Sequence, residues 1–209
     1  RRAEGDVPAA RLLLDEAEHV YNTDMSPPVR PVAAVNAAVQ LANGDVAAAR
    51  RWVSGRGLAP DGELSYVREY EHLTLARVLL AGHQTDRENQ SVDDAIRLLE
   101  RLLEAADGGG RNGSAIEILI VLALAHQAAG DRAAATTALE QALVLAEPEG
   151  YVRIFVDELP ALAPLLQAIS PHDSVGKYAH QLLAAAPSGA VEAGPPIGGS
   201  SQGLVDELS

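Results

Sequence analysis

The chain has no cysteine among its 209 residues, which excludes disulfides and thiolate chemistry and is typical of a reducing compartment. Aromatic residues are also scarce, at 3% of the chain, although 47% of the sequence is hydrophobic. A core must therefore be built from Ala, Leu, Val and Ile. Small side chains let helix axes approach closely, and Ala has the highest helix propensity, so an interior rich in Ala and Leu suits closely packed helices. The composition predicts an all-α fold.

Positive charge is in deficit, because 16 Lys and Arg residues face 29 Asp and Glu residues and leave a formal net charge of −13. Proteins that bind nucleic acid neutralise phosphates with clustered cations. We therefore expect this chain to make no direct contact with nucleic acid.

Long apolar runs are missing as well, since the longest, Ile118–Ala125, is far shorter than the roughly 20 residues that a membrane-spanning helix needs. The N-terminus also lacks the pattern of a signal peptide. Together with the absence of cysteine, these features lead us to expect a soluble, cytoplasmic protein that has no membrane partner.

Recognisable catalytic motifs are absent too. The six histidines show no i, i+4 pairing that would suit a metal ion, and no G-x-S-x-G nucleophile motif occurs. The cluster of Arg68, Glu69, Glu71 and His72 has the residue types for acid-base chemistry, but such charges on a repeat helix more often form ion pairs. We expect no enzymatic activity, no metal and no cofactor.

A Gly-Asp pair recurs along the chain. Each copy precedes a helical pattern, at Gly5-Asp6, Gly44-Asp45 and Gly130-Asp131. The second interval is about twice the first, which indicates a further unit in between, at Gly82, where the polar insertion HQTDRENQ replaces the pair. Four units of about 40 residues would then extend to Glu147, as in a helical repeat array. In each junction the Gly would end one helix and the Asp would cap the next.

The helices of these units differ in pattern. Residues Ser91–Asp107 carry one apolar stripe, with Ser91 as the expected cap and Gly108–Gly110 as the expected stop. Asp131–Glu147 repeats this design. Ser114–Ala129 is apolar on nearly all sides, which suits a helix enclosed by its neighbours, although ILIVLA alone would also be compatible with a strand.

The helix expected over Gly62–Ala81 carries charges that do not share one face. An unpaired charge beside a packed surface is costly, so these groups must either pair with one another or line a wet groove. We predict that four of these charged residues and one neighbouring aromatic residue bind a ligand or a partner. They are Arg68, Glu69, Glu71, Arg77 and Tyr66. The alternative is a structural network of ion pairs between repeats.

Two segments, YVREYEHLTLARVLLAG (Tyr66–Gly82) and EPEGYVRIFVDELPALAPLL (Glu147–Leu166), resemble the tetratricopeptide-like region of MalT-type, LuxR-family transcriptional regulators. In that family a nucleotide-binding module precedes the helical region and a LuxR-type helix-turn-helix follows it. The tail Gly203–Ser209 looks like the approach to that DNA-binding module. The chain itself contains neither a GxxxxGK[ST] loop nor a DNA-reading helix, so the resemblance assigns ATP binding and operator binding to no residue here.

The resemblance implies a sensor and coupling segment. Such a segment binds an unknown small-molecule effector or protein partner on its concave surface and transmits that state to the adjoining nucleotide-binding and DNA-binding modules. A constitutive scaffold of the tetratricopeptide type remains the alternative.

The C-terminal part is expected to close the array. Tyr151–Leu166 reads as a closing helical element with an Arg153–Asp157 ion pair, interrupted by Pro160 and Pro164. It would cover the last repeat or offer a surface to the DNA-binding module. A further short helix is expected over Lys177–Ala186. These patterns predict a repeat domain over residues 1–186 and a linker rich in Pro, Gly and Ser over residues 187–209.

Overall fold

The computed structural model describes residues 7–20, 29–86 and 89–185. Every regular element in these ranges is a helix, which confirms the all-α prediction. The α-helices are α1 (Val7–Val20), α2 (Val32–Ala42), α3 (Val46–Arg56), α4 (Glu69–Asp86), α5 (Asn89–Gly108), α6 (Asn112–Ala128), α7 (Arg132–Ala146), α8 (Arg153–Val156), α9 (Leu159–Leu166) and α10 (Ser174–Ala184). Two 3-10 turns, η3 (Tyr66–Arg68) and η4 (Glu147–Glu149), precede α4 and follow α7.

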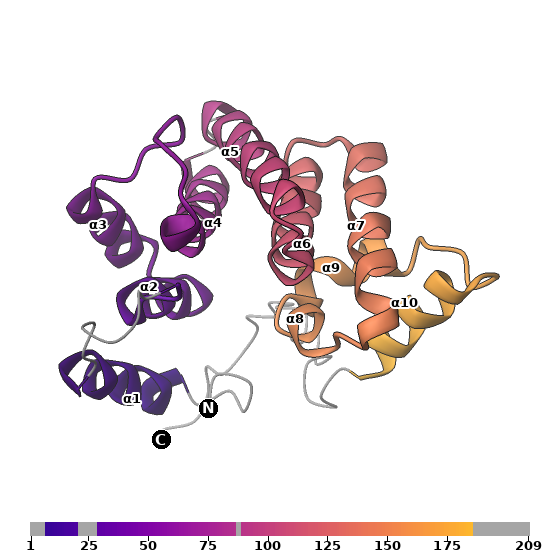
Figure 1. Cartoon of the computed structure of the whole chain (residues 1–209), viewed down its shortest axis with the longest axis horizontal. Helices are drawn as coiled ribbons and strands as arrows, with labels where there is room; N and C mark the ends of the chain where they lie inside the picture. Colours follow the sequence, from indigo (N-terminus) through magenta and orange to yellow (C-terminus); the bar gives the residue numbers. More distant parts are fainter. Residues whose placement is uncertain (1–6, 21–28, 87–88, 186–209) are drawn as a thin grey trace, which may run out of the picture.

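The helices form a stack of antiparallel pairs, α2 with α3, α4 with α5 and α6 with α7 (Figure 1). The first helices of successive pairs also contact one another, α2 with α4 and α4 with α6. The second helices α1, α3, α5 and α7 begin at Val7, Val46, Asn89 and Arg132, at intervals of about 40 residues. The predicted tetratricopeptide-like repeat is therefore confirmed.

The Gly-Asp joints have the expected geometry. Gly44 and Gly130 adopt φ of 81° and 82°, in the left-handed region that glycine enters without strain. The side chains of Asp45 and Asp131 accept hydrogen bonds at 3.0 Å from the backbone N–H groups of the residues three positions further on. Each pair thus ends one helix and caps the next. Gly5-Asp6 lies outside the described residues.

The core is made of aliphatic side chains, as the composition predicts. Helix α6 supplies nine buried residues between Ala115 and Ala125, which confirms an enclosed helix and rules out a strand there. Helix α5 packs its single apolar stripe against α4 and α6. None of the described helices is both long and apolar enough to cross a membrane.

The helix end predicted at Gly82 is wrong. Helix α4 runs on to Asp86, because the residues after Gly82 contain no helix breaker, and α5 begins at Asn89, so that both bounds fall within the polar insertion HQTDRENQ. Gly82 is buried inside α4, where an added Cβ would lie 2.6 Å from Nη2 of Arg50 on α3. This glycine therefore leaves room for the Arg50 guanidinium against α4. Ser91 is likewise inside α5, two residues after its first residue, and does not cap it.

The helix predicted over Gly62–Ala81 begins later, at Glu69. Gly57 ends α3 in the left-handed conformation, with φ of 61°, and the residues up to Ser65 are irregular. Arg101 of α5 donates hydrogen bonds of 2.8 Å to the carbonyl oxygens of Pro60 and Gly62. Backbone contacts of this kind hold the segment without a helix.

The chain closes on α7 with three further helices. Phe155, Leu159 and Leu162 of this closing segment are buried and Ile154 is partly buried. Arg153 forms the expected ion pair with Asp157 at 3.1 Å. The interruption lies between α8 and α9 and not at the prolines, since Pro160 sits in the first turn of α9, where no N–H is needed, and Pro164 lies within that helix.

Helix α10 begins at Ser174, three residues before the predicted start at Lys177. Asp173 caps it by accepting a hydrogen bond of 2.7 Å from the N–H of Gly176. The predicted linker over residues 187–209 lies outside the described residues.

Candidate functional site

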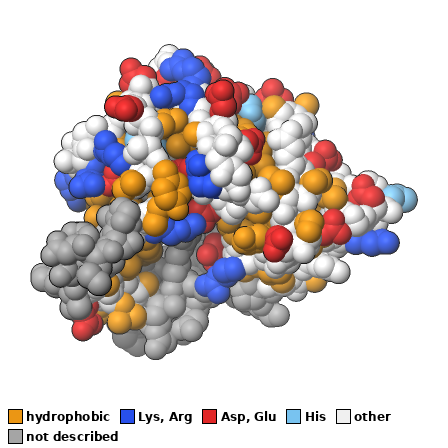
Figure 2. Space-filling model, in the orientation of Figure 1, with side chains coloured by type: hydrophobic (Ala, Val, Ile, Leu, Met, Phe, Trp, Pro, Cys, Tyr) orange, Lys and Arg blue, Asp and Glu red, His pale blue; other side chains and the backbone are white. Residues whose placement is uncertain are grey.

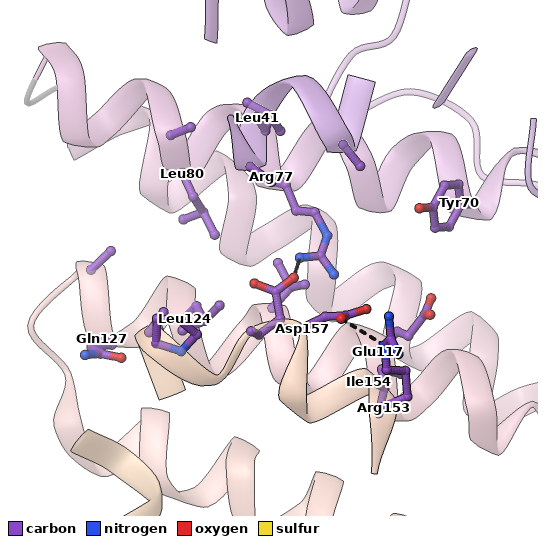
Figure 3. Close-up of a pocket in the computed structure, with 18 of the residues that line it drawn as sticks. Leu41, Tyr70, Arg77, Leu80, Glu117, Leu124, Gln127, Arg153, Ile154 and Asp157 are labelled. Atoms are coloured by element: carbon purple, nitrogen blue, oxygen red, sulfur yellow. Dashed lines mark hydrogen bonds and ion pairs between the residues drawn. The ribbon is translucent and has the colours of Figure 1, made fainter. Parts of the chain in front are cut away.

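A groove of about 1340 Å³ lies on the face formed by the first helices α2, α4 and α6. The α8–α9 segment forms its opposite side (Figure 3). Apolar side chains from all these elements line it, namely Leu41, Leu80, Leu124 and Ile154. An array of separate helices therefore produces one continuous surface that a ligand can contact from several repeats.

Three ion pairs surround this apolar lining. Arg77 on α4 points towards the α8–α9 side of the groove (Figure 3). Its Nη1 group forms an ion pair with Glu158, between α8 and α9. The Nη2 group of Arg30, just before α2, lies 2.6 Å from Oε1 of Glu117 on α6. The third pair joins Arg153, the first residue of α8, to Asp157, the residue that follows this helix. The charges of the groove are thus balanced, and two of the three pairs join different parts of the fold.

A smaller cavity of about 330 Å³ adjoins the groove and shares Arg30, Tyr70 and Glu117 with it. The Arg30 guanidinium lies over the Tyr70 ring, 4.8 Å from its centroid. Burial lowers the pKa of Arg30, but the hydrogen bond and the charge of Glu117 outweigh it, so that this pKa is raised. Arg30 therefore remains a cation between the two cavities.

Two of the predicted site residues, Arg68 and Glu71, lie away from both cavities, at the joint between α3 and α4. The carboxylate of Glu71 is buried and accepts hydrogen bonds of 2.9 Å from Nε of Arg56 and from Nε of Arg68. Burial raises the pKa of Glu71, but the hydrogen bonds from Arg68 and Arg56 lower this pKa by more than burial raises it. The pKa of Glu71 is therefore below its ordinary value. The pair of arginines thus holds a buried anion.

His72 is buried beside this cluster. Its Nδ1 lies 3.0 Å from the carbonyl oxygen of Arg68, and burial lowers its pKa. A buried, neutral imidazole in this position fills space in the core and forms a hydrogen bond with the backbone of η3.

The other three predicted residues line the cavities. Tyr66 and Glu69 line the smaller cavity, where Arg111 donates to the Glu69 carboxylate from Nε at 3.2 Å and from Nη2 at 2.7 Å. Tyr66 is 54% exposed, and its ring lies below the Arg111 guanidinium at 5.3 Å. Arg77 lines the groove. The five predicted residues are therefore divided among three places.

Sequence reasoning missed Arg30, Tyr70 and Glu117. One signal was available, because Glu117 is the only charged residue in the apolar stretch Ser114–Ala125. A lone acid in an enclosed helix needs a partner, and this one finds it 87 residues away in Arg30. The partner could not be identified without the tertiary structure.

No group of three or more His, Asp or Glu side chains in the described part of the chain is placed to hold a metal ion. On the face shown in Figure 2, acidic and basic side chains intermingle with hydrophobic ones.

The stacked antiparallel pairs and their groove define a helical repeat protein of the tetratricopeptide class. The sequence matches the family model of the MalT-like TPR region over residues 1–172, and the chain belongs to that family. No curated protein and no solved structure matches the chain.

Proposed function

We propose that this chain is the sensor and coupling segment of a MalT-like, LuxR-family transcriptional regulator and that it binds its effector in the groove. The observation that carries this proposal is the groove itself, about 1340 Å³ in volume and lined by three repeats and by the closing helices. Concave sites with an apolar lining and a few polar groups are the usual form of a ligand site.

The same geometry supports coupling. A ligand in the groove contacts α4 and α6 of the repeats as well as the α8–α9 segment that follows them. The Arg77–Glu158 ion pair links these two parts. An effector that prefers one packing of α8–α9 against the repeats would shift the population towards it, and the shift would reach whatever follows α10.

The surroundings of the segment follow from the same proposal. Its partners are an effector or partner protein and the nucleotide-binding and DNA-binding modules of the parent regulator, in the cytoplasm. The segment itself requires no cofactor and performs no catalysis. With a formal net charge of −13, it leaves contact with DNA to the adjoining module.

The test is to fill the groove. Ala42, at the end of α2, is exposed and lines the groove, so Ala42→Trp should block it without disturbing the core. Ala133→Trp, on the exposed side of α7, is the matched control. Melting temperatures of the three proteins would be measured against a set of small metabolites and short peptides. A ligand at 100 times its Kd stabilises a protein by about 2.7 kcal/mol.

We expect at least one compound to raise the melting temperature of the wild type and of Ala133→Trp but not that of Ala42→Trp. A compound that stabilises all three proteins equally would place the site elsewhere and contradict the proposal.

A constitutive protein-binding scaffold is the second candidate, favoured by the exposed apolar side chains of Tyr151 and Val152 at the rim of the groove. Such a scaffold would be stabilised only by a protein partner. No response to any small molecule, together with stabilisation by a folded partner, would favour this candidate over the sensor.

A further inference from the structure

Two units of identical composition lie side by side at the smaller cavity. In one, Arg111 covers the Tyr66 ring and binds the Glu69 carboxylate. In the other, Arg30 covers the Tyr70 ring and binds the Glu117 carboxylate. Each unit combines an aromatic face with a carboxylate, which is the chemistry that recognises guanidinium and alkylammonium groups. In both units the protein supplies its own cation.

The two arginines differ in how firmly they are held. The Arg111 side chain is 25% exposed, donates to Glu69 from two nitrogens and also donates to the carbonyl oxygen of Ala105 at 2.8 Å. The Arg30 side chain is 58% exposed and donates from Nη2 to Glu117. The two glutamate side chains, in contrast, are similarly enclosed, with exposed fractions of 12% for Glu69 and 15% for Glu117.

This difference separates a structural cation from an exchangeable one. Arg111 bridges α6 to α4 and is anchored to the backbone, so its removal would break a link between repeats. Arg30 approaches from the segment before α2, while Tyr70 and Glu117 are held in place by α4 and α6. Another cation that pairs with Glu117 and covers the Tyr70 ring would replace both of these Arg30 contacts, so it can compete with the exposed Arg30 side chain for this position.

We propose that Tyr70 and Glu117, with the cavity of about 330 Å³ beside them, form a binding site for the guanidinium or alkylammonium group of a ligand, which Arg30 occupies as an internal competitor. The inference rests on the proposed function and deepens it, because it assigns a cationic group to the effector. The formal net charge of −13 attracts such a ligand to the chain.

The site explains why one carboxylate stands in an otherwise apolar helix. Departure of Arg30 would leave Glu117 without this cation in a largely enclosed place, which is costly. The Glu69 carboxylate stays neutralised by Arg111. An incoming cation would therefore restore the lost charge pairing at Glu117 and cover the face of Tyr70.

The experiment titrates the whole chain with defined probes and follows NMR chemical shifts. The probes are agmatine, as a free small cation, and acetyl-Gly-Arg-Gly-amide, as a guanidinium on a peptide. Acetyl-Gly-citrulline-Gly-amide has nearly the same shape without the charge and serves as the ligand control. Because a tethered arginine competes at a high effective concentration, Arg30→Ala should bind a cationic probe at least tenfold more tightly than the wild type.

Three further variants complete the test. Glu117→Gln in the Arg30→Ala background should abolish the gain, and Tyr70→Leu in the same background should reduce it. Arg97→Ala removes an arginine that is 64% exposed on α5 and should leave probe affinity unchanged. Circular dichroism melts would establish that each variant is folded. If the variant that combines Arg30→Ala with Glu117→Gln does not fold, the variant that combines Arg30→Ala with Tyr70→Leu still tests the site through its reduced probe affinity.

Binding of agmatine alone would indicate a small-molecule source of the cation, and binding of the peptide alone would indicate a protein partner; both support the site. Equal affinity for the arginine and citrulline peptides, or no gain in Arg30→Ala, would overturn it. This result is distinct from failure of the proposed function, because the groove-filling variant Ala42→Trp tests ligand binding whatever charge the ligand carries.

Discussion

Helices α4 and α6 hold the same position in successive repeats, but they are built in opposite ways. Both are first helices enclosed by neighbours on two sides. Helix α6 fills this position with nine buried residues, all of them apolar. Helix α4 buries Glu69, Glu71, His72 and Thr74 in addition to its apolar residues. An enclosed helix can therefore carry charge, provided that a neighbouring element supplies each partner.

The partners of the α4 charges come from different elements, and this has a consequence for specificity. Glu71 binds Arg56 at the end of α3, and Glu69 binds Arg111 at the start of α6. Apolar contacts do not depend on which aliphatic neighbour makes them, whereas each ion pair requires one particular residue. The region around α4 should thus respond to pH and to single charge changes, while α6 should respond to lost volume.

The largest effect is expected from a cavity in α6. Leu119 is 2% exposed, and Leu119→Ala should lower the free energy of unfolding by about 2–5 kcal/mol, because the enclosed helix cannot collapse into the space. Val144→Ala, at a position that is 55% exposed on α7, is the control and should change it by less than about 0.5 kcal/mol. Urea unfolding measures both. Equal losses would contradict the enclosed position of α6.

The next effect concerns the buried charge of α4. Glu71→Gln should cost about 1–3 kcal/mol at pH 7, because the two arginines lose their charged acceptor. Since folding lowers the pKa of Glu71, the ionised carboxylate stabilises the fold above its unfolded pKa of about 4.3 and loses this contribution as the pH falls below it.

The difference between wild type and Glu71→Gln should therefore shrink between pH 7 and pH 3 in urea unfolding experiments. The control is Glu100→Gln, at an exposed position on α5, which should change the free energy of unfolding at pH 7 by less than about 0.5 kcal/mol. A difference that stays constant down to pH 3 would mean that Glu71 is not held as a buried anion.

A smaller effect tests the Gly-Asp joint that follows α6. Gly130 follows α6 with φ of 82°, and an added Cβ would meet no atom within 4 Å, so Gly130→Ala costs only the left-handed conformation, about 1 kcal/mol. Gly55 within α3 has the same free space but no positive φ. Gly55→Ala should therefore stabilise the protein slightly in thermal melts. Destabilisation by both variants to the same degree would remove the conformational explanation.

The smallest effect is expected at an exposed ion pair. Arg97 pairs with Asp94 three residues earlier on α5, and its side chain is 64% exposed. Arg97→Ala should change the free energy of unfolding by at most about 0.5 kcal/mol, and less in 1 M salt, since solvent screens such pairs. A loss as large as that of Glu71→Gln would contradict the distinction between buried and exposed charges.

The local features of the fold could be predicted from the sequence with good accuracy. The periodicity of α5 and α7 and the Gly-Asp chemistry at Gly44 and Gly130 act within a few residues, so the sequence contains all the information that these features need. The wrong prediction at Gly82 has the same origin. A glycine inside a helix and a glycine at its end look alike until it is known that Arg50 of α3 lies against it.

The sequence by itself determined the helical repeat, its period and the charges that α4 would have to bury. Only the tertiary structure decided which partners those charges have, because Glu69 and Glu117 meet arginines that lie 42 and 87 residues away. The groove was decided in the same way, since its lining comes from α2, α4, α6 and the α8–α9 segment. Helical periodicity and capping are local, whereas ion pairs and cavities depend on how distant segments pack.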